Sequence, residues 1–242
     1  MEERELTDFE RRALLIRAHL KPDLRYDLSL IPDPFIIEFA GPASSGKSTV
    51  IREVYKLFKR QGYRVRKPEE GPEVVNYIPR TTPEYNIRTG HYSVALLMDF
   101  SWGHQNDLVL LERGAFDPYC WMEYWFRKGK LTEGQMRELQ NHFLMDFFTK
   151  KIDVAFFFVC ESSVAIARET RFEIVKTLGQ TTNPETIDLL NEIYKDAYQR
   201  LVPKYPQLSL VDTTRLSEVE MVKLVADAIL DTLEKKVIAA SS

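Results

Sequence analysis

The sequence predicts an α/β protein in which a parallel β-sheet carries helices on both of its faces. Short apolar runs that suit buried strands alternate along the chain with amphipathic segments that suit helices, and this order is typical of parallel sheets. A segment rich in glycine and serine joins the first apolar run to the amphipathic segment after it. A turn of this composition is expected where a strand passes directly into a helix.

The N-terminal segment is predicted to be a helical extension of the main domain. Apolar residues recur at three- and four-residue spacing over residues 4–20, which predicts an amphipathic helix. Three prolines within residues 21–34 indicate a connector. We therefore assign residues 1–34 to an N-terminal helix and connector, and residues 35–238 to a single domain.

The first half of this domain contains three predicted strands. Residues 35–40 form an apolar run that suits a buried strand, and apolar positions at helical spacing after the glycine-rich turn predict a helix that Gly62 ends. A second strand is predicted at residues 63–66. A helix is predicted over residues 94–105, and residues 108–111 suit a third buried strand.

The second half of the domain repeats the alternation. Thr132 and Gln135 have the spacing of a capping box, which predicts the start of a helix that runs to about residue 150. The remaining predicted elements are a strand at 152–160, a helix at 185–201 directly after Pro184, a strand at 208–212 and a helix at 217–236.

Length and composition predict a soluble cytoplasmic protein. The 242 residues are 44% hydrophobic, and the formal charge of −3 argues against general nucleic-acid binding. Cys120 and Cys160 are too few for a disulfide framework, which fits a reducing compartment. The charged N-terminus does not resemble a signal peptide, and no apolar run approaches the roughly 20 residues that span a bilayer, so we expect no membrane contact.

Residues 41–48 read Gly-Pro-Ala-Ser-Ser-Gly-Lys-Ser and match the whole phosphate-binding pattern G-x-x-x-x-G-K-S/T. Backbone N–H groups of such a loop, together with the helix N-terminus, bind phosphate oxygens. Lys47 can reach the β- and γ-phosphates, and the Ser48 hydroxyl can bind Mg²⁺. The predicted ATP contacts are Gly41, Ala43, Ser44, Ser45, Gly46, Lys47, Ser48 and Thr49.

A phosphate-binding loop occurs in several classes of protein, and the rest of the chain excludes some of them. Signalling GTPases carry an Asn-Lys-x-Asp segment and transporter ATPases carry Leu-Ser-Gly-Gly-Gln, and neither segment occurs here. Mechanical ATPases usually end an apolar strand with Asp-Glu, whereas this strand ends with Glu112 and Arg113. The elimination favours a small phosphotransferase.

The phosphate-binding loop, the strand that ends with Glu112 and Arg113, and the pair Arg168 and Arg171 together resemble the thymidylate kinase and deoxynucleoside kinase families over about residues 35–235. The resemblance implies a P-loop kinase fold with a five-stranded parallel sheet. It also implies that Glu112 helps to hold magnesium and that Arg113 contacts the reacting phosphoryl group. The two later arginines would belong to a lid that closes over the nucleotide.

The chemistry of these residues supports the same roles independently. A carboxylate at the carboxyl end of a buried parallel strand lies where open α/β sheets bind ligands, and the planar guanidinium of arginine suits phosphoryl oxygens. The alternatives are a structural ion pair for Glu112 and Arg113 and a solvated helix surface for Arg168 and Arg171. Gly114 departs from the Glu-Arg-Ser of deoxynucleoside kinases and from the Asp-Arg-Tyr of thymidylate kinases.

The site of the phosphoryl acceptor is less distinct. Glu69 and Glu70 follow the second strand, where nucleoside kinases place a carboxylate that accepts the proton of the 5′-hydroxyl, and Glu70 is the candidate; an ordinary charged loop is the alternative. Arg80 and Arg88 are candidates for binding an acceptor phosphate. Trp102 either stacks on a base or, as is more common for a lone helical tryptophan, lies in the core.

We therefore predict ATP- and magnesium-dependent phosphoryl transfer to a nucleoside monophosphate or nucleoside, with the monophosphate preferred. The alternatives are a kinase of another small molecule and a regulatory P-loop protein with slow ATP hydrolysis. His91, His104 and His142 have no ligand-like spacing, so we expect no zinc site. The N-terminal helix is expected to pack on the sheet edge or to form a homodimer.

Overall fold

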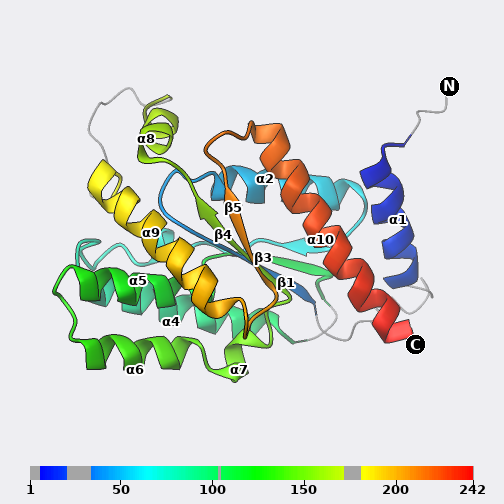
Figure 1. Ribbon diagram of the computed structural model, residues 1–242. Helices are drawn as coiled ribbons and strands as arrows, with labels where there is room; N and C mark the ends of the chain where they lie inside the picture. Colours follow the sequence, from blue (N-terminus) through cyan, green and yellow to red (C-terminus); the bar gives the residue numbers. More distant parts are fainter. Residues whose placement is uncertain (1–5, 21–33, 103–104, 172–180, 242) are drawn as a thin grey trace.

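Five parallel strands form one sheet at the centre of the molecule (Figure 1). The computed structural model describes residues 6–20, 34–102, 105–171 and 181–241. The strand order is β2-β3-β1-β4-β5, which confirms the predicted class. The strands are β1 (Phe35–Ala40), β2 (Val65–Arg66), β3 (Leu108–Glu112), β4 (Val154–Val159) and β5 (Leu208–Asp212).

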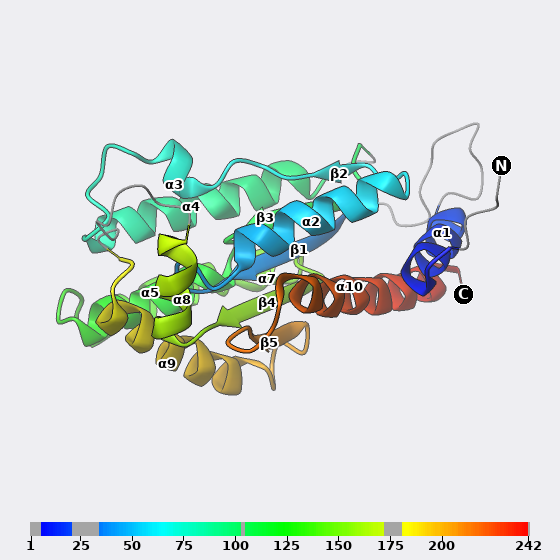
Figure 2. The same ribbon diagram turned by 90° about the horizontal axis from the view of Figure 1, so that it is seen from above.

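Helices cover both faces of this sheet (Figures 1 and 2). The covering on both sides explains why the central strands read as continuous apolar runs. On one face lie α2 (Lys47–Arg60) and α10 (Glu218–Ser241), with α1 (Asp8–Leu20) packed against α10. The other face holds α4 (Pro83–Phe100), α5 (Phe116–Arg127), α6 (Glu133–Phe143), α7 (Asp146–Thr149) and α9 (Pro184–Leu201). Two short helices, α3 (Gly71–Val74) and α8 (Ser162–Thr170), follow β2 and β4.

The alternation of side chains along β1 separates two apolar layers. Phe35, Ile37 and Phe39 pack with α2 and α10, whereas Ile36 and Ala40 pack with α5 and α9. Glu38 lies between Ile36 and Ala40 in sequence and therefore points to the α5 side, where it is fully buried. A carboxylate at this place needs polar partners, which the loop after β3 supplies (see below).

The parallel arrangement brings the carboxyl ends of the strands to one edge of the sheet. In the register of the sheet, Phe39 of β1 lies beside Glu112 of β3 and beside Phe156 of β4. The segments that leave these strands are the phosphate-binding loop after β1 and residues 113–115 after β3. All sequence candidates for binding ATP follow strands at this edge.

Some predicted elements differ from the structure. The helix expected at 94–105 begins at Pro83 and ends at Phe100, and the helix expected at 132–150 breaks into α6 and α7. The capping box of Thr132 and Gln135 is confirmed. Helix α5 was not predicted at all. The connector 21–34 lies outside the described residues except for Pro34, as does His104.

The core position predicted for Trp102 is wrong. Its side chain is 76% exposed and lies 5.2 Å from the Lys151 ammonium, measured to the ring centre. Because Lys151 precedes β4, this tryptophan lies at the amino edge of the sheet, opposite to the phosphate-binding loop. It is therefore not placed to stack on a base at the carboxyl edge.

Helix α1 packs mainly on α10 rather than on an edge strand, and the Phe9 ring lies 5.6 Å from the Phe58 ring of α2, measured between ring centres. The Arg12 guanidinium forms ion pairs with Asp231 at 2.6 Å and Glu234 at 3.2 Å, and the Tyr63 hydroxyl donates to the Ala13 carbonyl. The homodimer expected from this helix remains a prediction. In the described part of the chain, no helix is both long and apolar enough to cross a bilayer.

Candidate active site

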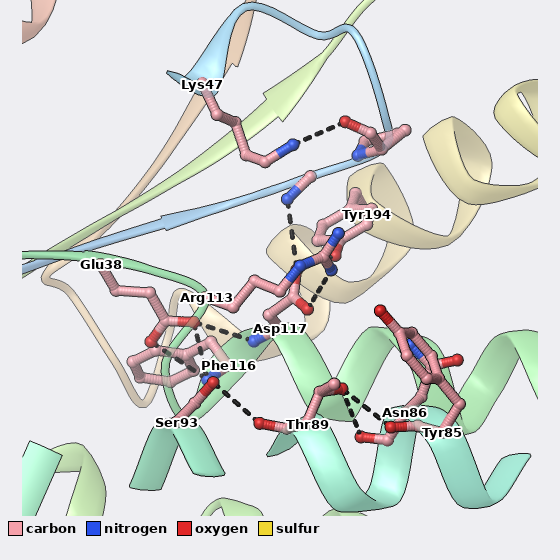
Figure 3. Close-up of polar contacts among 12 residues, drawn as sticks. Glu38, Lys47, Tyr85, Asn86, Thr89, Ser93, Arg113, Phe116, Asp117 and Tyr194 are labelled. Carbon is pink, nitrogen blue, oxygen red and sulfur yellow. Dashed lines mark hydrogen bonds and ion pairs between the residues drawn. The ribbon is translucent and has the colours of Figure 1, made fainter. Parts of the chain in front are cut away.

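The phosphate-binding loop connects β1 to α2 and has the backbone that its sequence requires. Gly41 has a φ of 144°, and a Cβ there would lie 2.4 Å from the Phe158 carbonyl oxygen. Gly46 has a φ of 100° and no side chain caps α2, so the first N–H groups of this helix are open to an anion. Buried Lys47 donates from Nζ to the Pro42 carbonyl at 2.7 Å (Figure 3), and its burial lowers the pKa of the ammonium.

A cavity of about 650 Å³ opens beside this loop. Its volume falls in the usual range for a small-molecule site. The walls come from the loop, from α8 and from the segment between β5 and α10. They include Ser44, Gly46, Lys47, Ser48, Thr49, Arg168, Glu169, Arg171, Leu216, Ser217 and Met221. The structure thus brings most of the predicted ATP contacts and both later arginines to one cavity.

The two later arginines have different surroundings. The Arg168 guanidinium donates to the carbonyl of Thr213 at 2.8 Å and to its hydroxyl at 3.0 Å, so it joins α8 to the end of β5. Arg171 is exposed and follows the last residue of α8. The Ser44 hydroxyl of the loop donates to Glu169, which lies between them in sequence. Residues 172–180, which follow Arg171 in the sequence, lie outside the described residues.

The Ser48 hydroxyl and Glu112 form an oxygen site that fits magnesium. Ser48 Oγ donates to Glu112 Oε1 at 2.9 Å, and Glu112 Oε2 is buried with no hydrogen-bond partner in the described residues. No group of three or more His, Cys, Asp or Glu within the described ranges is arranged to hold a metal. Magnesium in phosphoryl-transfer sites commonly takes one or two carboxylates plus water and substrate phosphates, so this small donor set is sufficient.

Glu70 lies next to Glu112, because β2 and β3 are neighbours in the sheet. Burial and, after it, the charge of Glu112 raise the pKa of Glu70 to about 7. Glu69 is exposed to solvent instead. Of the two sequence candidates, the structure therefore brings only Glu70 to the phosphate-binding edge.

Arg113 follows Glu112 and turns back over the start of α5. Its backbone has a φ of 69°, which is uncommon for a residue with a side chain. Its Nη1 donates to the carboxylate of Asp117 at 2.6 Å (Figure 3), and its guanidinium lies 5.7 Å from the ring centre of Trp121. Its Nε is buried and has no partner among the described residues. The Nε–H edge of the guanidinium thus has no partner among the described residues.

The N-terminal half of α4 faces this group from the other side. The Tyr85 hydroxyl is buried without a hydrogen-bond partner in the described residues, as is Trp121 Nε1 of α5. Asn86 accepts from Trp125 Nε1 at 2.9 Å. Arg80 and Arg88 are exposed, although the Arg80 guanidinium lies 6.0 Å from the ring centre of Tyr85.

Comparison with known proteins gives a match at the level of structure. No family model matches the chain, and no curated protein matches it. A structure of deoxyadenosine kinase from M. mycoides with the products dCMP and dCDP matches with a TM-score of 0.58 and 18% identity, over 81% of this chain and 100% of that chain. A structure of the same enzyme with bound dATP matches with a TM-score of 0.57 and 18% identity, over 80% of this chain and 97% of that chain. The chain has the P-loop kinase fold.

Within this P-loop kinase fold, sequence reasoning missed four residues around Arg113 that the structure brings together. The Ala115-Phe116-Asp117-Pro118 segment does carry a helix-start signal, since acidic residues and proline are frequent in a first turn. No local pattern marks a buried carboxylate within a strand or an unpaired tyrosine hydroxyl. The missed residues are Glu38, Tyr85, Asp117 and Trp121.

Proposed function

We propose that the protein transfers the γ-phosphoryl group of ATP to a hydroxyl group of a nucleoside. The observation that carries this proposal is the position of Glu70. Its carboxyl group has a pKa of about 7, lies beside Glu112 and shares the carboxyl edge of the sheet with the phosphate-binding loop. A base with a pKa near the working pH suits removal of a proton from a neutral hydroxyl.

The charges around the acceptor side favour a nucleoside over the monophosphate that the sequence alone favoured. An acceptor phosphate would need cations besides those at the γ-phosphoryl group, to which Arg113 is assigned, but Arg80 and Arg88 are exposed. The buried donors that have no partner in the described residues, on Tyr85 and Trp121, are neutral. Neutral donors suit the hydroxyl, ring oxygen and base of a nucleoside.

The phosphate-binding loop would form the part of the site that binds ATP, the phosphoryl donor. Lys47 and the backbone N–H groups of residues 43–48 would bind the triphosphate, and Ser48 with Glu112 would hold magnesium. Bound magnesium would neutralise part of the phosphate charge. Arg113, Arg168 and Arg171 would supply further positive charge around the γ-phosphoryl group.

In the proposed reaction the acceptor hydroxyl loses a proton and gains a phosphoryl group. The acceptor O–H bond breaks as its proton passes to the Glu70 carboxylate. The acceptor oxygen forms a bond to the γ-phosphorus while the bond to the β-γ bridging oxygen breaks, so ADP leaves and a nucleoside monophosphate forms. The proton on Glu70 returns to solvent. The similarity in fold to a deoxyadenosine kinase supports a nucleoside as acceptor.

The test is a panel of nucleosides and nucleoside monophosphates with γ-labelled ATP, together with the variants Glu70→Gln and Glu69→Gln. We expect label in a nucleoside monophosphate, a loss of about 10²–10⁴ in kcat for Glu70→Gln, and little change for exposed Glu69→Gln. Label only in a diphosphate, with a higher acceptor KM in Arg80→Ala or Arg88→Ala, would assign a monophosphate acceptor instead. ATP hydrolysis without transfer would contradict the kinase proposal.

A further inference from the structure

Glu38 ties strand β1 to the first turn of α5. Its carboxylate accepts the backbone N–H of Ala115 at 3.0 Å. It also accepts the backbone N–H of Phe116 at 3.1 Å and of Asp117 at 2.9 Å (Figure 3). These are the N–H groups that the start of a helix leaves unsatisfied, and the helix dipole favours a negative charge there. A side chain from the central strand thus caps α5 from inside the protein.

The segment between β3 and α5 is shaped to accept this carboxylate. A Cβ on Gly114 would lie 2.4 Å from Glu38 Oε2, so only glycine allows the chain to pass so close. This contact gives a physical reason for the glycine that replaces the serine of deoxynucleoside kinases. Burial raises the pKa of Glu38 to about 7, although the N–H groups of Phe116 and Asp117 lower it. The placement of this carboxyl is therefore costly and needs all of its partners.

Asp117, on the turn that Glu38 caps, connects Arg113 to the rest of the site. One carboxylate oxygen of Asp117 accepts from Arg113 Nη1 at 2.6 Å. The other accepts from the hydroxyl of Tyr194 on α9 and from the N–H of Gly41, the first loop residue, at 3.4 Å (Figure 3). Asp117 is itself buried. A single side chain thus fixes Arg113 relative to both the phosphate-binding loop and α9.

We propose that Glu38 and Asp117 are positioning residues for Arg113: Glu38 fixes the first turn of α5, and Asp117 on that turn holds the guanidinium so that its unpaired Nε points to the transferring phosphoryl group. The proposal rests on the proposed function, in which Arg113 contacts that group. Arg113 has a left-handed backbone and a long side chain, and both need external constraint to adopt one geometry. Neither carboxylate touches a substrate.

A double-mutant cycle tests this relationship. The variants are Asp117→Asn, Arg113→Ala and the two combined. Asparagine keeps an oxygen for the Tyr194 hydroxyl and the Gly41 N–H but loses the charge that holds the guanidinium. We expect Asp117→Asn to lower kcat about 10–100-fold with a much smaller change in KM for ATP, because a displacement near 1 Å can cost that much. Adding Asp117→Asn to Arg113→Ala should cost almost nothing more.

The second readout does not depend on the acceptor. The affinity for ADP, Mg²⁺ and aluminium fluoride, which together mimic the transferring phosphoryl group, is measured for the same four proteins. We expect the effect of Asp117→Asn on this affinity to be smaller by a factor of about ten or more when Arg113→Ala is already present. If the wild-type protein phosphorylates no nucleoside, the proposed function fails, yet this cycle still decides whether Asp117 positions Arg113. Independent effects of the two substitutions in both readouts would overturn the proposal.

Glu38→Gln and a matched control complete the test. Glu38→Gln replaces an acceptor oxygen by a donor that faces the N–H groups of α5, and it should lower kcat in the same way as Asp117→Asn. If this variant does not fold, the Asp117→Asn cycle alone decides. Glu123→Gln is the control, because Glu123 lies on the same helix and pairs with Arg127 at 3.2 Å and Arg200 at 3.3 Å, away from the loop. It should lower the Tm without coupling to Arg113→Ala.

Discussion

Glu70, the residue that precedes α3, lies beside Glu112, the last residue of β3, and the proximity of Glu112 adds to burial in raising the pKa of Glu70 to about 7. Two adjacent carboxyl groups cannot both ionise without mutual repulsion. The Ser48 hydroxyl donates to Glu112 at 2.9 Å, whereas Glu70 has no such support from the loop. This difference suits Glu112 to a cation and Glu70 to a proton.

The raised pKa of Glu70 predicts a pH dependence of stability. The native state holds this proton more tightly than the unfolded state, whose carboxyl has a pKa near 4.5. The contribution of Glu70 to the free energy of unfolding should therefore be largest below pH 4.5 and should be lost as pH rises through about 7. Urea unfolding of the wild type and of Glu70→Gln between pH 4.5 and 8 measures the difference. The prediction is contradicted if the difference in free energy of unfolding between the wild type and Glu70→Gln does not change with pH. It is also contradicted if the exposed control Glu69→Gln shows the same pH dependence.

Lys47→Ala should abolish phosphoryl transfer and leave the fold intact. The loss of one preorganised charge at the phosphates should lower kcat by about 10²–10³ or more. Circular dichroism checks the fold and labelled ATP checks the rate. Lys56→Ala is a matched control, because Lys56 lies on the same helix and pairs with Glu53 at the surface. A folded Lys47→Ala protein with wild-type turnover would contradict the assignment of the phosphate-binding loop.

Glu112→Gln and Arg113→Ala should separate metal binding from charge stabilisation. Removing the negative charge of Glu112 should raise the magnesium concentration needed for half-maximal rate, because Mg²⁺ prefers carboxylate oxygens. Arg113→Ala should instead lower kcat at saturating magnesium. Titration of each variant with MgCl₂ distinguishes the two effects. If both variants keep the wild-type magnesium dependence, the role of Glu112 is structural.

Arg168→Ala and Arg171→Ala should have different effects, although the sequence alone assigned both residues to one lid. Arg168 joins α8 to Thr213, so its loss should loosen the wall of the ATP cavity, raise KM for ATP and lower the Tm. Arg171 lines the same cavity from the end of α8, and Arg171→Ala should mainly lower kcat. Steady-state kinetics with ATP and thermal unfolding measure both variants. Identical KM and Tm values for the pair would contradict this division.

Gly114→Ala should destabilise the fold by about 1–3 kcal/mol, because the added methyl group overlaps the buried carboxylate of Glu38. It should also lower kcat, since the displaced turn carries Arg113 and Asp117. Gly134→Ala is the control, because a Cβ at that helical position meets no atom within 4 Å in the described structure. A Gly114→Ala protein as stable as the wild type would show that Glu38 can move.

Local patterns in the chain are enough to predict the class of the fold and the phosphate-binding loop. The strand, glycine-rich turn and helix around Lys47 are continuous in the chain, so their spacing alone specifies a phosphate-binding loop. The parallel alternation then predicts that Glu112, at the end of its strand, and Glu70, in the segment after the preceding strand, lie at the same edge as this loop. In the structure Glu112 is the last residue of β3, and Glu70 precedes α3 beside it. Local patterns suffice here because each signal and its partner lie within a few residues, or at equivalent ends of strands.

The surroundings of Arg113 and the burial of single aromatic residues depend on contacts between distant parts of the chain. Trp102 is exposed, yet nothing in the neighbouring sequence distinguishes an exposed ring from a buried one, because burial depends on which elements pack against it. Glu38 and Asp117 act through partners 77 residues away in the chain, on the first turn of α5 and on α9. A buried carboxylate is tolerated only where several hydrogen-bond donors surround it in the folded protein. These donors come from distant parts of the chain, so no local sequence pattern predicts them.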